Sequence, residues 1–140
     1  MALPDDFASV LAKVEERGIL NEDPQTIENR LALSVQTAGL RGGQRDLGDL
    51  GVGDWTLGVI SRLKKALSSE MCDAEKKSLK DDYKILLNKG LTPEGITAVA
   101  AVVAAVVSVV NPAFAVSNII IFLAIWLLKR GLDRFCSVPF

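Results

Sequence analysis

The sequence predicts an all-α protein, with an N-terminal four-helix cytoplasmic domain followed by a C-terminal transmembrane helical hairpin. Three observations predict this fold class. Apolar residues recur at helical spacing through the first 91 residues. Residues 95–128 then form a run of 34 positions without a charged side chain. An Asn-Pro pair interrupts this run near its middle and divides it into two segments of roughly membrane-spanning length.

The first two helices are predicted from apolar spacing and from capping residues. Asp23 is a suitable N-cap, and Pro24 suits the first helical position, so a helix is predicted over residues 24–38. We expect Gly39 to end this helix, because glycine is common just past helix ends. An earlier helix over residues 4–18 is predicted from four apolar residues at positions i, i+3, i+4 and i+7: Phe7, Val10, Leu11 and Val14.

A glycine-rich segment over residues 39–53 holds six of the 11 glycines of the chain, which predicts a loop. Arg41 and Arg45 within it are candidate ligands for a phosphate or another anion, because guanidinium and backbone N–H groups bind anions. The segment lacks the Lys-Ser/Thr ending of a phosphate-binding loop. A flexible linker between two pairs of helices is the interpretation we favour.

Two more helices complete a predicted soluble domain over residues 1–91. The third covers residues 54–69 and begins with Asp54 as its N-cap, and the fourth covers residues 73–89. One side of the fourth helix carries a basic stripe, which would either rest against anionic lipid or face solvent: Lys76, Lys77, Lys80 and Lys84.

The uncharged run predicts a transmembrane hairpin over residues 92–131. A single helix of 34 residues would be about 51 Å long, whereas the hydrocarbon core of a bilayer is about 30 Å thick. Asn111 and Pro112 favour a turn. We therefore expect two helices, over residues 93–110 and 112–130.

Basic residues on both sides of the hairpin predict its orientation. Lys84 and Lys89 precede it, and Lys129 and Arg130 follow it. Because basic flanks favour the cytoplasmic side, we expect a multi-pass protein of the inner (cytoplasmic) membrane with both termini in the cytoplasm. Residues 132–140 would form a short cytoplasmic tail. A soluble form that inserts on activation and a hairpin buried permanently in a soluble protein are the two alternatives.

Small and polar residues of the hairpin are candidates for a membrane or oligomer interface. Small residues at four-residue spacing let helix backbones approach closely in lipid. A polar amide within an apolar helix either seeks a partner across helices or lies close to the far interface. A tryptophan beside a basic flank is typical of the membrane–water interface. These criteria select Ala100, Ala101, Ala104, Ala105, Ser108, Asn118 and Trp126.

Composition argues against several classes of protein. The chain has no histidine, and Cys72 and Cys136 match no metal-ligand spacing. We therefore expect no metal site, no cofactor and no enzymatic activity. The net charge of −1 argues against a nucleic-acid partner.

The hairpin runs from Thr92-Pro93-Glu94-Gly95 through Asn111-Pro112 to Lys129-Arg130, and a soluble domain precedes it. In size and plan the chain resembles the small two-helix membrane effectors of prokaryotic antiphage and abortive-infection systems. The resemblance implies activation by a sensor protein or a small signalling ligand. We therefore expect a homo-oligomer that perturbs or perforates the bilayer when triggered. The alternative is a non-catalytic membrane anchor or adaptor that recruits a cytoplasmic partner through its helical domain.

Overall fold

The structure is a computed structural model that describes residues 3–41, 54–71 and 92–130. Every regular element within these ranges is helical, which confirms the all-α class. The elements are α1 (Phe7–Glu16), the 3-10 turn η1 (Ile19–Asn21), α2 (Pro24–Arg41), α3 (Asp54–Met71), α5 (Pro93–Val110), the 3-10 turn η3 (Pro112–Phe114) and α6 (Ser117–Arg130).

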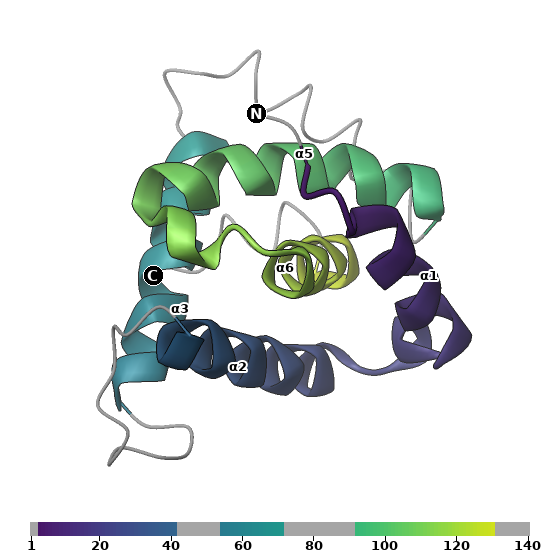
Figure 1. Ribbon diagram of the computed structural model, residues 1–140, viewed down its shortest axis with the longest axis horizontal. Helices are drawn as coiled ribbons and strands as arrows, with labels where there is room; N and C mark the ends of the chain where they lie inside the picture. The colour runs from purple at the N-terminus through teal and green to yellow at the C-terminus, as the bar shows by residue number, and fades with distance from the viewer. Residues whose placement is uncertain (1–2, 42–53, 72–91, 131–140) are drawn as a thin grey trace.

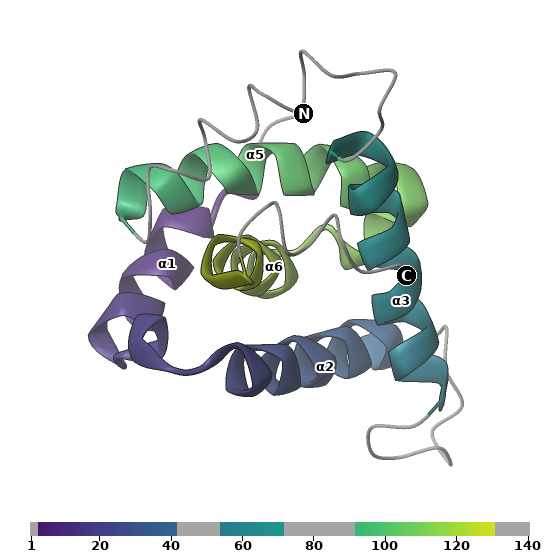
Figure 2. The same ribbon diagram turned by 180° about the vertical axis from the view of Figure 1, so that it is seen from behind.

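Helix α6 occupies the centre of the molecule. Figure 1 shows it nearly end-on, with α5 on one side and α2 on the opposite side, while α1 and α3 close the two remaining sides. The view from behind in Figure 2 gives the same arrangement. Contacts join α6 to α2, α5 and α1, and α3 bridges α5 and α2. The two helices of the uncharged run, α5 and α6, therefore pack with the amphipathic helices. Helix α6 crosses α5 steeply (Figure 1).

The first two helices form largely where their spacing and caps predict them. Helix α1 is shorter than predicted, and Gly18 adopts a left-handed conformation (φ 70°) that turns the chain into η1. The backbone N–H of Thr26 donates to Asp23 Oδ1 at 2.8 Å, so Asp23 is the N-cap that the sequence predicts. Helix α2 passes through Gly39 to Arg41 instead of ending there. One helical glycine costs only about 1 kcal/mol, and burial of Val35 on the preceding turns holds the helix.

Helix α3 follows the predicted third helix and extends it by two residues, to Met71. Its inward side is apolar, with Val59, Ile60, Leu63 and Leu67 buried. The predicted fourth helix over residues 73–89, loop residues 42–53 and the predicted tail over residues 132–140 lie outside the described residues.

The uncharged run is divided at Asn111, as predicted, but its second helix begins later than expected. Asn111 is extended (φ −164°), and its Oδ1 accepts a hydrogen bond from the backbone N–H of Ala113 at 3.0 Å. Pro112 opens η3, and the buried ring of Phe114 anchors this turn. Helix α6 consequently begins at Ser117, not at residue 112.

Helix α6 is buried on every side. All residues from Ile119 to Leu127 are at most 8% exposed, and most are completely buried. A helix that is apolar all round needs apolar surroundings on all its faces, in a protein core or in lipid. In this structure the surrounding helices supply them.

Candidate functional site

The small residues at four-residue spacing in α5 form two lines, one on the buried face of the helix and one on its exposed face. Ala100 and Ala104 are completely buried, whereas Ala101 and Ala105 are exposed. Ser108, on the edge between the faces, is half-buried and its Oγ donates to the carbonyl oxygen of Ala104 at 2.8 Å. The inward line lets neighbouring helices pack closely against α5, and the outward line faces solvent.

The outward face of α5 has an unusual composition for a helix at the surface. Thr97, Ala101, Ala105 and Val109 are exposed, and Val109 is 88% exposed. Glu94, in the first turn, is the one charged residue of the whole helix. Because surface helices normally carry charged residues on their solvent side, this uncharged face is a candidate contact surface.

The uncharged surface continues around η3. The large apolar residues that are exposed among the described residues are Leu33, Val109 and Val116. Val109 and Val116 lie on either side of η3 in the chain, and Leu33 and Val116 line the same pocket of about 410 Å³. No charged side chain lines this pocket within the described residues. Exposed apolar residues that gather in this way are typical of interaction surfaces.

Helix α5 is long and apolar enough to cross a membrane, and it is the one helix among the described residues that meets both conditions. Its 18 residues extend about 27 Å, and 39% of that span is buried inside the protein. The 14 residues of α6 extend only about 21 Å, which is less than the roughly 30 Å of a bilayer core.

Trp126 lies in the core between two cations. It is 1% exposed. Lys64 Nζ of α3 is 4.5 Å from the centre of the ring, and Arg130 Cζ, one turn further along α6, is 5.2 Å from it. Lys64 also forms an ion pair with Glu28 of α2. One buried ammonium group therefore links α2, α3 and α6.

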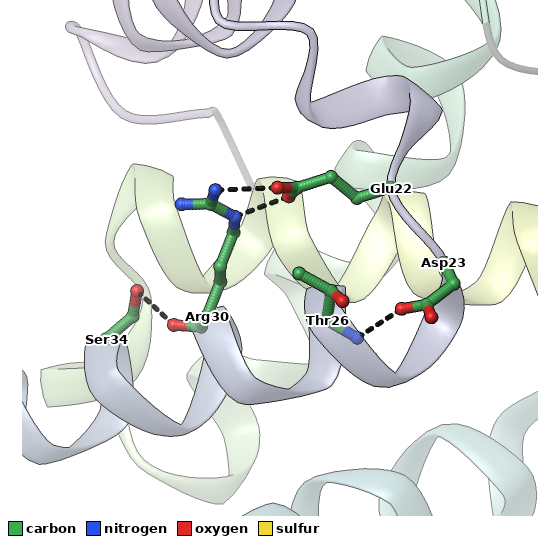
Figure 3. Close-up of polar contacts among 5 residues, drawn as sticks. All are labelled: Glu22, Asp23, Thr26, Arg30 and Ser34. Atoms are coloured by element: carbon green, nitrogen blue, oxygen red, sulfur yellow. Dashed lines mark hydrogen bonds and ion pairs between the residues drawn. The ribbon is translucent and has the colours of Figure 1, made fainter.

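A second polar cluster fixes the start of α2 (Figure 3). Arg30 donates from Nε and Nη2 to the two carboxylate oxygens of Glu22, at 2.5 and 2.8 Å. These hydrogen bonds lower the pKa of Glu22 and raise that of Arg30. Hydrogen bonds from Thr26 lower the pKa of Asp23. The hydroxyl of Ser34, one turn after Arg30 in the helix, donates to the carbonyl oxygen of Arg30 at 3.0 Å.

The first turn of α6 combines a buried contact with an exposed amide. Ser117 is buried and its hydroxyl donates to the carboxylate of Asp6, just before α1. Asn118 is exposed and lines the pocket beside η3 and a second pocket beside α1. The neighbouring residues Ser117 and Asn118 thus face the protein and the surface respectively.

The predicted anion-binding pair lies only partly within the described residues. Arg41 is the last residue of α2, and Arg45 lies outside the described residues. Among the described residues, no group of three His, Cys, Asp or Glu side chains is arranged to hold a metal ion.

The contacts of Lys64 were not predicted, although the spacing of this lysine from apolar residues of the same helix indicates them. Lys64 falls four residues after Ile60 and three before Leu67, both of which are buried. A cation at this spacing shares the inward face of the helix and needs a partner there.

Comparison with protein-family models, with curated proteins and with solved structures finds no match for this chain.

Proposed function

We propose that this protein is a membrane effector that holds its most deeply buried helix, α6, inside a helical body and inserts the α5–η3–α6 segment into the bilayer when triggered. The observation that carries the proposal is the uncharged outer surface of α5 and η3, next to a helix, α6, that is buried on every side. The outer surface would meet the membrane first, and α6 would follow it.

Energetics favour lipid as the destination of α6. Burying one Ile, Leu or Phe side chain contributes about 1.5–3 kcal/mol, so exposing Ile119 to Leu127 to water would cost on the order of 10 kcal/mol or more. Transfer into lipid replaces one apolar environment with another and avoids most of this cost. Insertion also breaks the polar contacts of Ser117 and Trp126 with the rest of the protein.

In the inserted form we propose the hairpin that the sequence predicts, with Asn111 at the far side of the inner membrane and both basic flanks in the cytoplasm. Residues 112–116 would join α6 and lengthen it to 19 residues, about 28 Å. The absence of charge over residues 95–128 supports this arrangement.

The exposed line of Thr97, Ala101 and Ala105 supports a role in oligomer assembly, because small residues allow close contact between helices of different copies. The oligomer would perturb or perforate the membrane without catalysis. The resemblance to antiphage and abortive-infection effectors supports a role in defence or cell death, under the control of a sensor protein or a signalling ligand.

Expression in bacterial cells, with membrane potential, growth and fractionation followed together, tests this proposal. The wild-type chain is expected to depolarise the cells when it is expressed at a high level or when the cells are infected by phage as the trigger. Val109→Lys places a charge on the outer face of α5 at an exposed position, and is expected to remain folded and to leave the cells polarised. Ser69→Lys adds the same charge at an exposed position of α3 and is expected to act like the wild type.

Two results would overturn the proposal. Cells that stay polarised, with the protein in the soluble fraction, both at high expression and during phage infection would exclude membrane action. Membrane fractionation without depolarisation, together with co-purification of a cytoplasmic partner, would favour the anchor or adaptor.

A further inference from the structure

A pocket of about 310 Å³ lies between α1, η1, α2 and α6, apart from the outer surface of α5. Three cationic side chains line it: Lys13 from α1, Arg17 from the C-cap of α1, and Arg30 from α2. Apolar side chains line it as well, among them Val14, Ile19 and Phe122, which are at most 8% exposed. The pocket therefore combines apolar walls with cationic groups.

The charge of this pocket is positive. Lys13 and Arg17 are four residues apart on one helix, so they share a face with Val10 and Val14. Within the described residues, no acidic side chain lines the pocket. Glu22 balances the charge of Arg30 and holds its guanidinium group through two hydrogen bonds, and Nη1 takes part in neither of them. Lys13 and Arg17 then supply the net positive charge, and Arg30 supplies an oriented donor.

The size of the pocket limits the ligand. Small-molecule sites generally have volumes of about 300–1,000 Å³, and this pocket is at the lower end of that range. A single short alkyl chain fits such a volume, whereas a two-chain phospholipid does not.

We propose that this pocket binds a small single-chain anionic amphiphile, an alkyl phosphate or alkyl carboxylate. The anionic head would lie against Lys13 and Arg17, and the chain would lie along Val14, Ile19 and Phe122. The Asn118 amide, at the first turn of α6, is a further hydrogen-bonding group at the pocket. The site would connect α1, α2 and α6. This inference does not depend on the proposed membrane activity.

Isothermal titration calorimetry on the full chain with monomeric octyl phosphate, below its micelle concentration and without vesicles, tests the inference. We expect saturable binding, at least tenfold weaker in Lys13→Gln/Arg17→Gln. The matched control Arg62→Gln/Lys65→Gln removes the same two charges from exposed positions of α3 and should bind like the wild type. Because a ligand that binds only the folded state stabilises it, octyl phosphate should also raise the Tm of the wild type and of the control.

Octanol and inorganic phosphate separate the two parts of the ligand. Each is expected to bind at least tenfold more weakly than octyl phosphate. The inference is overturned if octyl phosphate does not bind saturably, if octanol or inorganic phosphate binds equally well, or if the control variant loses as much affinity as Lys13→Gln/Arg17→Gln. Circular dichroism of both variants shows whether they are folded like the wild type.

Discussion

Lys64 joins three helices through one ammonium group, which pairs with Glu28 and lies 4.5 Å from the centre of the Trp126 ring. Lys64→Met keeps most of the apolar stem and removes the charge, so Glu28 loses this partner and Trp126 loses a cation. We expect the free energy of unfolding to fall by about 1–2 kcal/mol in urea denaturation followed by circular dichroism.

Lys65→Met is the matched control for this prediction, because Lys65 is the exposed neighbour of Lys64 on α3. Its free energy of unfolding should stay within about 0.5 kcal/mol of the wild type. Equal stability of Lys64→Met and the wild type would show that the contacts with Glu28 and Trp126 contribute nothing to stability.

At the residue scale, contacts between residues that are close in the sequence can be predicted, whereas contacts between residues on distant helices cannot. Asp23 and Thr92 are caps because their side chains reach backbone groups three residues away, at 2.8 and 3.0 Å, and such spacing is visible in the sequence. Trp126 was predicted to be an interfacial anchor from its basic neighbours. Its contact with Lys64, 62 residues earlier, depends on how α3 packs against α6, and no local pattern encodes that packing.

At the scale of the helix, the two small-residue lines of α5 should respond differently to added volume. Ala104 is completely buried and Ala105 is exposed. Ala104→Leu adds volume to a packed core and should destabilise the protein by about 1–3 kcal/mol, whereas Ala105→Leu should leave the Tm nearly unchanged. Thermal unfolding of the two variants measures the difference, and equal Tm values would mean that the face around Ala104 is not packed in solution.

The junction between η1 and α2 should make stability depend on acidic pH. The pKa values of Glu22 and Asp23 are lowered from their ordinary values of 4.5 and 3.8, chiefly by hydrogen bonds from Arg30 and Thr26. A carboxylate with a lowered folded-state pKa stabilises the fold above its ordinary pKa, and this contribution is lost as the pH falls through the folded-state value. The free energy of unfolding should therefore decrease as the pH is lowered below about 5.

Glu22→Gln/Asp23→Asn removes both titrations and should give a lower stability at neutral pH and a flatter pH profile than the wild type, in urea denaturation at a series of pH values. Glu15→Gln/Glu16→Gln removes the same charge from exposed positions of α1 and should keep the wild-type slope. An equally steep profile in the Glu22→Gln/Asp23→Asn variant would contradict the assignment of the pH dependence to this junction.

Helix boundaries that a local cap determines are predicted more closely than boundaries that depend on tertiary packing. Asp23 is the cap that the sequence predicts at the start of α2, and Thr92 caps the start of α5 in the same way. Gly39 does not end α2, because packing outweighs the small cost of one helical glycine. Pro112 is compatible with a helix start, yet the buried Phe114 stabilises a 3-10 turn there and delays α6 to Ser117. The spacing of apolar residues in the sequence does not predict this packing contribution.

At the scale of the whole molecule, the sequence predicts all-α structure and two apolar segments, but not the neighbours of those segments. An all-apolar helix needs apolar surroundings, and the sequence does not distinguish lipid from a protein core. The central position of α6 depends on α1, α2, α3 and α5 each offering an apolar face to the interior. Phe7, Ile27 and Leu63 belong to the same core as Ile120, although up to 113 residues separate them.

If the proposed membrane activity requires α6 to leave the core, then fixing the start of α6 to the rest of the protein should block that activity. The Ser117 hydroxyl donates to the Asp6 carboxylate, so a disulfide between cysteines at these two positions would tie the start of α6 to the segment before α1. In a chain with Cys72→Ser and Cys136→Ser, the oxidised Asp6→Cys/Ser117→Cys variant should fail to release dye from anionic vesicles.

Reduction of the same sample should restore dye release, because it frees α6 without changing the sequence. The single variant Ser117→Cys, treated with the same oxidant, should release dye before and after reduction. Equal release by the oxidised and reduced double-cysteine variant would mean that the first turn of α6 stays beside α1 during membrane action. The outer surface of α5 and η3 would then have to act on the bilayer without the departure of α6.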